Sequence, residues 1–146
     1  MGEKAYGVSA GEGEVHFTLR CDTMDKMKAL EEKAEKSARD IASKHNLEVD
    51  IEWLEDFHSS HNDAKSVDYI RDVVKDLGYD LKEEDHPFKW GEDFGMFTHH
   101  YCGAMFCIGS GEDHPALHPP DYDFPDEMIE TGVRIFYGIA NRILHV

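Results

Sequence analysis

The N-terminal part of the chain alternates apolar and polar residues in two stretches, residues 14–21 and 47–53. Alternation with a period of two is typical of a strand with one buried face. Between these stretches, apolar residues recur three and four positions apart, as on one face of a helix. That row consists of Met27, Leu30, Ala34, Ala38 and Ile41. Thr23 suits the start of this helix and Asn46 its end, so the pattern predicts a strand–helix–strand unit with Arg20 on a polar face.

The C-terminal part predicts two more helices and a buried strand. Asn62 or Asp63 can cap a helix that closes at Gly78, and Pro125 suits the first turn of the last helix. The apolar row of that last helix is Ile129, Val133, Phe136, Ala140 and Ile143. Residues 104–108 are continuously apolar, as in a strand covered on both faces. We therefore expect an α/β or α+β fold, a two-layer sandwich in which a mixed sheet of three to four strands packs against about three long helices.

Length and charge limit the classes of function. A chain of 146 residues forms one domain or two small ones. Its net charge of -16 disfavours nucleic acid and anionic membranes as partners. No apolar run approaches the roughly 20 residues that span a bilayer. The three cysteines are an odd number in a chain too large to depend on disulfides, so we expect reduced thiols and a cytoplasmic protein.

Residues 91–124 concentrate the side chains that carry chemistry. Two pairs, His99 with Cys102 and His114 with His118, have the spacings of a structural zinc site. The apolar run 104–108 fills most of the sequence between the pairs, which weighs against that site. Cys107 within this run is expected to be a core residue, as is Cys21 in the first alternating stretch. The adjacent Glu92 and Asp93 fit the start of a helix better than an acid/base pair.

Three motifs in this region, GEDFGMF, YCGAMFCIGSGE and ALHPPDYDFPDEMIETG, resemble the C-terminal end of a known family. It comprises the zinc-dependent exopeptidases and amidohydrolases that include aminoacylase, hippurate hydrolase and glutamate carboxypeptidase. The resemblance implies that His118 is the last ligand of a two-metal centre. It also places Arg20 where relatives bind the substrate carboxylate, a role that suits the planar guanidinium. The alternative for Arg20 is an ion pair with an acidic residue on a solvated face.

The resemblance also implies how the chain is organised. Residues 1–60 correspond to the second half of a lid or dimerisation domain, and residues 61–146 to the C-terminal segment of a catalytic domain. The other metal ligands and the glutamate base of the family lie before the matched region. We therefore expect a hydrolase fragment that is inactive alone, with zinc, manganese or cobalt as the metal of the intact family and none required to bind this chain.

The expected substrate of the intact enzyme is a small N-acyl amino acid or peptide with a free carboxylate. The expected protein partner is a second copy of the chain or the missing N-terminal half. Two other functions stay open: a non-catalytic module that self-associates or completes a partner, and a small domain with the local zinc site described above.

Overall fold

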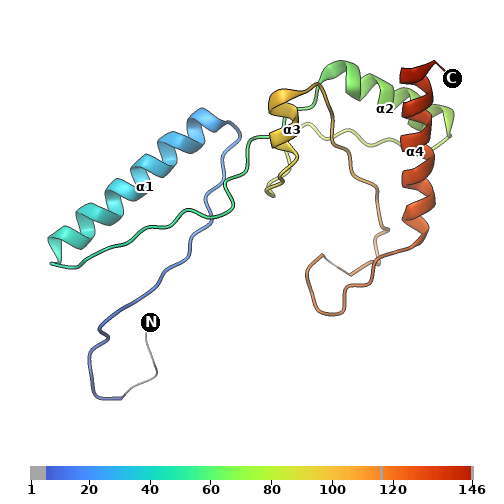
Figure 1. Ribbon diagram of the computed structural model, residues 1–146. Helices are drawn as coiled ribbons and strands as arrows, with labels where there is room; N and C mark the ends of the chain where they lie inside the picture. Colours follow the sequence, from blue (N-terminus) through green and yellow to red (C-terminus); the bar gives the residue numbers. More distant parts are fainter. Residues whose placement is uncertain (1–5, 116, 146) are drawn as a thin grey trace. The chain divides into compact units, whose positions relative to one another are not determined.

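The computed structural model describes residues 6–115 and 117–145, which form four helices and no strand (Figure 1). The chain divides into two compact units, Met1–Leu54 and Glu55–Val146. In the described residues, no helix is both long enough and apolar enough to cross a membrane.

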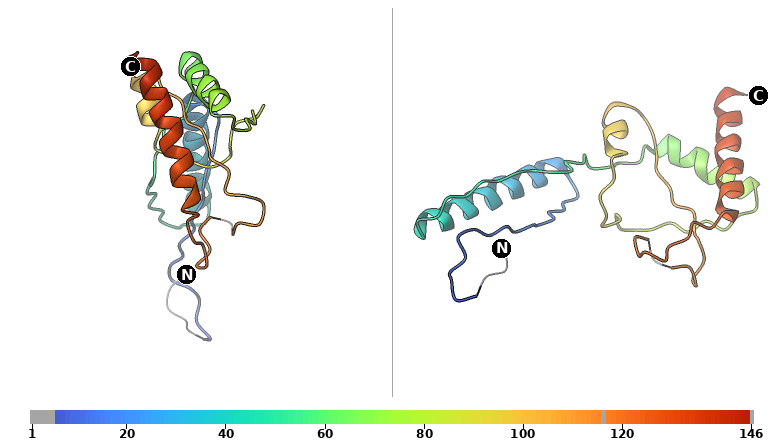
Figure 2. Two further views of the ribbon diagram at one scale, coloured as in Figure 1. Left: turned by 90° about the vertical axis from the view of Figure 1, so that its right-hand side faces the viewer. Right: turned by 60° about the horizontal axis from the view of Figure 1, so that its bottom comes forward.

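The first unit is built on one helix, α1 (Met24–Lys44). It begins after Thr23 and ends before Asn46, whose φ of 53° is left-handed, so the predicted helix is confirmed. The Thr23 side chain makes no capping hydrogen bond. Instead, exposed ion pairs four residues apart support the helix surface, including Lys26 Nζ with Asp22 at 2.7 Å. Residues 47–54 run alongside α1 in both figures (Figures 1 and 2).

The predicted strands of this unit are wrong. Residues 14–21 and 47–53 have no strand structure, and side chains expected in a core are exposed, with Val15 at 72% and Phe17 at 82%. A strand is stable only when a neighbouring strand takes up its backbone hydrogen bonds and another layer covers its apolar face. Neither is present in the described residues, so the two-layer sandwich with a mixed sheet does not form. Cys21, predicted to be buried, is exposed for the same reason.

The second unit contains α2 (Ala64–Asp76), which follows its predicted boundaries. Asp63 caps it: one carboxylate oxygen accepts hydrogen bonds from the Ser66 backbone N–H at 2.9 Å and hydroxyl at 3.0 Å. These bonds, the backbone one first, hold the pKa of Asp63 below its usual value. Gly78 ends the helical segment with a φ of 71°, a conformation that glycine adopts without strain.

The core of this unit lies between α2 and α4 (Glu127–Leu144), which pack against each other (Figure 1). Its buried residues are Ile70, Val73, Val74 and Ile135. Gly138 allows the two helices to approach closely, because a Cβ there would lie 2.6 Å from Val73 Cγ1. At the end of the contact, Arg142 forms ion pairs with Asp72 and Asp76.

The face of α4 that packs differs from the predicted one. The row expected in the core (Ile129, Val133, Phe136, Ala140 and Ile143) is exposed, whereas Ile135 and Ile139 face α2. The helix has two apolar rows, and spacing alone does not tell which of them meets α2.

Residues 103–108 are extended and lie against the α2 and α4 core, but they form no strand. Ala104 and Phe106 pack on the core, while Cys107, predicted to be buried, is exposed. The Asn62 side chain takes the place of a neighbouring strand. Its amide nitrogen donates to Met105 O and its oxygen accepts from Met105 N, both at 2.9 Å.

Candidate functional site

Histidines gather around the short helix α3 (Gly95–His100), whose last two residues are His99 and His100. The ring centroids of His58 and His99 are 4.8 Å apart, and those of His99 and His100 are 4.9 Å apart. Gly95 makes this possible, because a Cβ there would lie 2.0 Å from the His58 carbonyl oxygen. Only glycine therefore allows α3 to rest on the backbone of residues 58–59.

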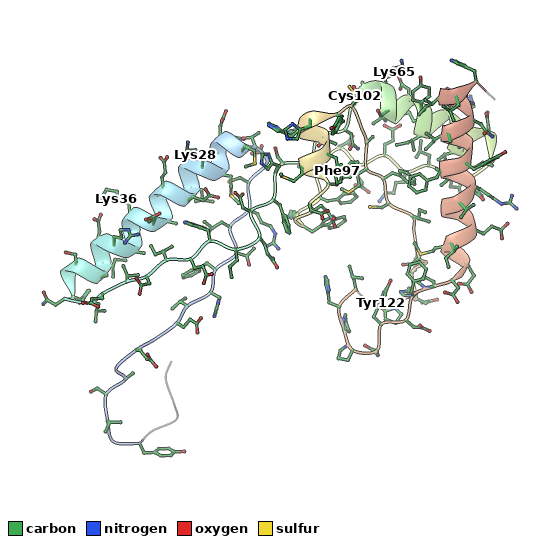
Figure 3. The ribbon with its side chains drawn as sticks, in the orientation of Figure 1. Lys28, Lys36, Lys65, Phe97, Cys102 and Tyr122 are labelled. Atoms are coloured by element: carbon green, nitrogen blue, oxygen red, sulfur yellow. The ribbon has the colours of Figure 1, made fainter. Side chains whose placement is uncertain are left out.

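A shallow concavity of about 340 Å³ opens beside these rings. It is lined by His61, Asn62, Asp63, Thr98, His99, His100, Tyr101 and Cys102. Figure 3 shows Cys102 where the chain leaves α3. His58 Nδ1 is buried and has no hydrogen-bond partner in the described part of the chain. The concavity is thus lined by three imidazoles and one thiol, side-chain types that serve as transition-metal ligands in proteins.

Sequence reasoning missed that His58 and His61 lie near this concavity. The motif HSSH directly before the α2 cap was a local signal that polar, titratable side chains sit at the entry to a helix. Nothing in the sequence indicates that this segment returns to α3, because the contact depends on the close approach at Gly95.

The local zinc site that the sequence left open as an alternative does not form in the described residues. His99 and Cys102 line one concavity, but His114 is engaged in its own loop. His114 Nδ1 lies 2.9 Å from Pro115 O, and its ring centroid is 5.3 Å from that of Tyr122. Across residues 6–115 and 117–145, no group of three or more His, Cys, Asp or Glu side chains is placed to hold a metal ion.

His118 is exposed in the proline-rich loop that precedes α4, and its backbone is strained, with a φ of 85°. A non-glycine residue in this region is uncommon, although histidine is among those that adopt it more often. Tyr122 N donates to Pro119 O at 3.0 Å and closes the turn that follows. One imidazole is not a metal site, so the described residues do not by themselves provide the cage that a catalytic ion needs.

Arg20 belongs to the first unit and is exposed. The ion pair considered as its alternative role is not present among the described residues. Arg20 lies in the first unit, whereas His118 lies in the second.

Comparison with known proteins identifies the family. The family model described as peptidase family M20/M25/M40 matches residues 2–142. The chain belongs to this family. The match covers nearly the whole sequence, including the three motifs in residues 91–132 that carry the resemblance.

Curated relatives of this M20 chain are deacetylases at low identity. The N-acetyldiaminopimelate deacetylase of Lacticaseibacillus casei (strain BL23) is 29% identical over 140 residues, which cover 94% of this chain and 36% of the relative. The protein of the same name from Bacillus subtilis (strain 168) is 23% identical over 137 residues, again 94% of this chain and 36% of the relative. The chain thus spans about a third of the length of these relatives. No solved structure matches it significantly.

Proposed function

We propose that this M20 chain is the C-terminal portion of a metal-dependent amidohydrolase that cleaves an N-acyl bond beside a free carboxylate. The observation that carries this proposal is the family match over residues 2–142. Relatives that share this region are named N-acetyldiaminopimelate deacetylase, which supports an N-acyl amino acid as the substrate class.

Two residues of the chain are assigned roles in this proposal. His118 supplies one ligand to a zinc, manganese or cobalt ion, and Arg20 binds the carboxylate of the substrate. The exposure of His118 and its strained backbone support the first role, because strained residues cluster at functional sites. The exposure of Arg20 supports the second, since the planar fork of its guanidinium pairs well with a carboxylate.

The chain alone is expected to be inactive. A catalytic zinc ordinarily takes three ligands from protein, and the described residues place no such set together. The remaining ligands and the general base come from the part of the family domain that lies outside the matched region. The bound ion would polarise the substrate carbonyl, while Arg20 orients the substrate through its carboxylate.

A chimera tests the proposal. In it, this chain replaces the matching 140 residues of the Lacticaseibacillus casei relative, and acetate release from N-acetyldiaminopimelate is measured. We expect turnover by the chimera and none by the chain alone. His118→Ala should lower turnover more than about 100-fold together with metal content, whereas His114→Ala, a matched histidine in the same loop, should leave both unchanged.

Arg20→Lys should raise KM more than it lowers kcat, because it weakens substrate binding rather than the chemical step. Turnover by the isolated chain with zinc, manganese or cobalt added would overturn the proposal. So would a His118→Ala chimera with unchanged activity and metal content.

A further inference from the structure

Three imidazole rings form a continuous row where α3 meets the segment before α2. The ring centroids of His58 and His99 are 4.8 Å apart, and those of His99 and His100 are 4.9 Å apart. His58 belongs to the segment that leads into α2, whereas His99 and His100 are the last residues of α3. The row therefore joins two segments that are far apart in the sequence.

One nitrogen of this row is closed off from solvent. His58 Nδ1 is buried and has no hydrogen-bond partner within the described residues. A neutral imidazole carries a hydrogen on only one of its two nitrogens, so it can leave Nδ1 without one. A protonated imidazole carries a hydrogen on both. Protonation of His58 therefore places a charged N–H donor where no acceptor lies, which disfavours the closed contact.

The groups around the row do not neutralise a charged ring. The structure places four further titratable side chains beside it: His61, Asp63, Tyr101 and Cys102. The Asp63 carboxylate is engaged at the start of α2, where it accepts two hydrogen bonds from Ser66. Among residues 6–115 and 117–145, no carboxylate forms an ion pair with any of the three rings. Protonation of neighbouring rings therefore adds like charges at short distance, which repel each other.

The chain that follows α3 is held by bonds that do not involve these rings. Asp63 N donates to Gly103 O at 2.9 Å, and the Asn62 side chain bonds both backbone groups of Met105. Helix α3 itself meets residues 58–59 at Gly95, next to the row. Loss of the ring contacts would therefore free α3 while residues 103–105 stay attached.

We propose that the row of His58, His99 and His100 is a pH-sensitive latch, which holds α3 against residues 58–59 when the rings are neutral and releases it when they are protonated. The released state takes up more protons. The latch is therefore at full strength above about pH 6.5, the ordinary pKa of a histidine side chain, and weakens as the pH falls below it. Residues 61–63 and 98–102 line one concavity, so release of α3 changes its shape. The inference does not depend on the proposed hydrolase activity.

The first experiment follows α3 in the unmodified chain by NMR at about pH 7.5 and about pH 5.5, on either side of the ordinary pKa of histidine. Asp63 stays charged over this range, because its pKa lies below its usual value. We expect the nuclear Overhauser contacts between the His58 and His99 rings to weaken at the lower pH and to return when the pH is raised.

Hydrogen exchange measures the release itself. Helix α3 has six residues and is too short to be stable when detached. At the lower pH, the protection of the Tyr101 amide, which donates to Phe97 O, should fall at least about fivefold after correction for intrinsic exchange. The Met105 amide should keep its protection, because it is bonded to Asn62. Unchanged ring contacts and Tyr101 protection would overturn the proposal, as would an equal loss of protection at Met105, which indicates general unfolding.

Variants test whether His58 causes the release. His58→Phe keeps an aromatic ring beside His99 and His58→Gln keeps a polar side chain, but neither takes up a proton in this range. In both, the protection of α3 should be the same at the two pH values. His114→Phe, a matched control whose ring lies against Tyr122, should keep the full pH dependence. Release at low pH that persists in either His58 variant would overturn the proposal.

Discussion

The close contact between α2 and α4 makes a sharp prediction for Gly138→Ala. The added Cβ would lie 2.6 Å from Val73 Cγ1 and 3.4 Å from Cγ2. Val73 is 3% exposed, and valine has few alternative side-chain rotamers, so its methyl groups have no room to move aside. The helices must therefore separate or shift.

Two opposing effects determine how much Gly138→Ala changes the free energy of unfolding. Alanine in the interior of a helix is favoured over glycine by about 1 kcal/mol. Inserting a methyl group into a packed contact costs about 1–3 kcal/mol, and a rigid neighbour in a core favours the upper end. Gly138→Ala should then lower the free energy of unfolding of the helix pair by about 1–2 kcal/mol.

A double-mutant cycle separates the overlap from other causes. Val73→Ala alone removes two buried methyl groups and should destabilise the pair by about 2 kcal/mol. In that background the space opposite residue 138 is free, so Gly138→Ala should stabilise by about 1 kcal/mol. The change of sign corresponds to a coupling of about 2–3 kcal/mol, the size expected for residues in contact.

The measurement is hydrogen exchange of the α2 and α4 amides by mass spectrometry, because α1 belongs to the other unit and would contribute to a whole-chain signal. Gly132→Ala is the matched control in the same helix, where a Cβ meets only Ile108 Cδ1 at 3.4 Å. It should stabilise by up to about 1 kcal/mol. If Gly138→Ala stabilises as much as the control, or shows no coupling to Val73→Ala, the packing argument fails.

Three further predictions concern the segments around α3 and α2. Gly95→Ala should move α3 away from the His58 carbonyl, destabilise this contact by about 1–3 kcal/mol or more, and change the NMR signals of the His58 ring. Asn62→Ala should speed exchange of the Met105 amide, which loses its acceptor, with a stability loss near 1 kcal/mol. Hydrogen bonds from Ser66 lower the pKa of Asp63 in the folded state. The stabilisation of α2 by the charged Asp63 carboxylate is therefore fully present above the usual pKa of aspartate and is lost as the pH falls through the lowered pKa.

Controls and contrary outcomes differ among the three. Gly109→Ala, which meets no atom within 4 Å, should leave the histidine signals unchanged. If the hydrogen-exchange rate of the Met105 amide is unchanged in Asn62→Ala, the hydrogen bond from Met105 N to the Asn62 side chain does not form in solution. For Asp63, a pH titration of α2 helicity should show a wild-type advantage over Asp63→Ala that disappears in acid; an advantage that persists there would contradict the role of the charged carboxylate.

Helix boundaries were predictable because their signals are local. The left-handed Asn46, the capping Asp63 and the closing Gly78 each act on backbone groups within a few residues. A strand, by contrast, needs a second strand to take up its backbone hydrogen bonds, and that partner lies outside the stretch that shows the alternation. Residues 14–21 do alternate apolar and polar side chains, but no strand in the described residues pairs with them.

Glycine in the sequence of α4 indicated which face packs against α2, although the spacing of apolar residues did not. Glycine within a helix is unfavourable by about 1 kcal/mol and usually has a packing reason. Gly138 lies near the Ile135 row and on the opposite side of the helix from the predicted row, and it marks the close approach to Val73. The histidines around α3 were less accessible to prediction, because the approach of residues 58–59 to Gly95 is a tertiary contact.

Asn62 also decides which side chains of a neighbouring segment are inside. Its side-chain amide forms hydrogen bonds with both the N–H and the C=O of Met105, which fixes the register of residues 104–108 against α2 and α4. In that register Ala104 and Phe106 pack on the core, and Cys107 is exposed to solvent. A slip by one position would exchange the two sets. The side-chain amide of Asn62 thereby determines which face of the segment packs on the core and which is exposed to solvent.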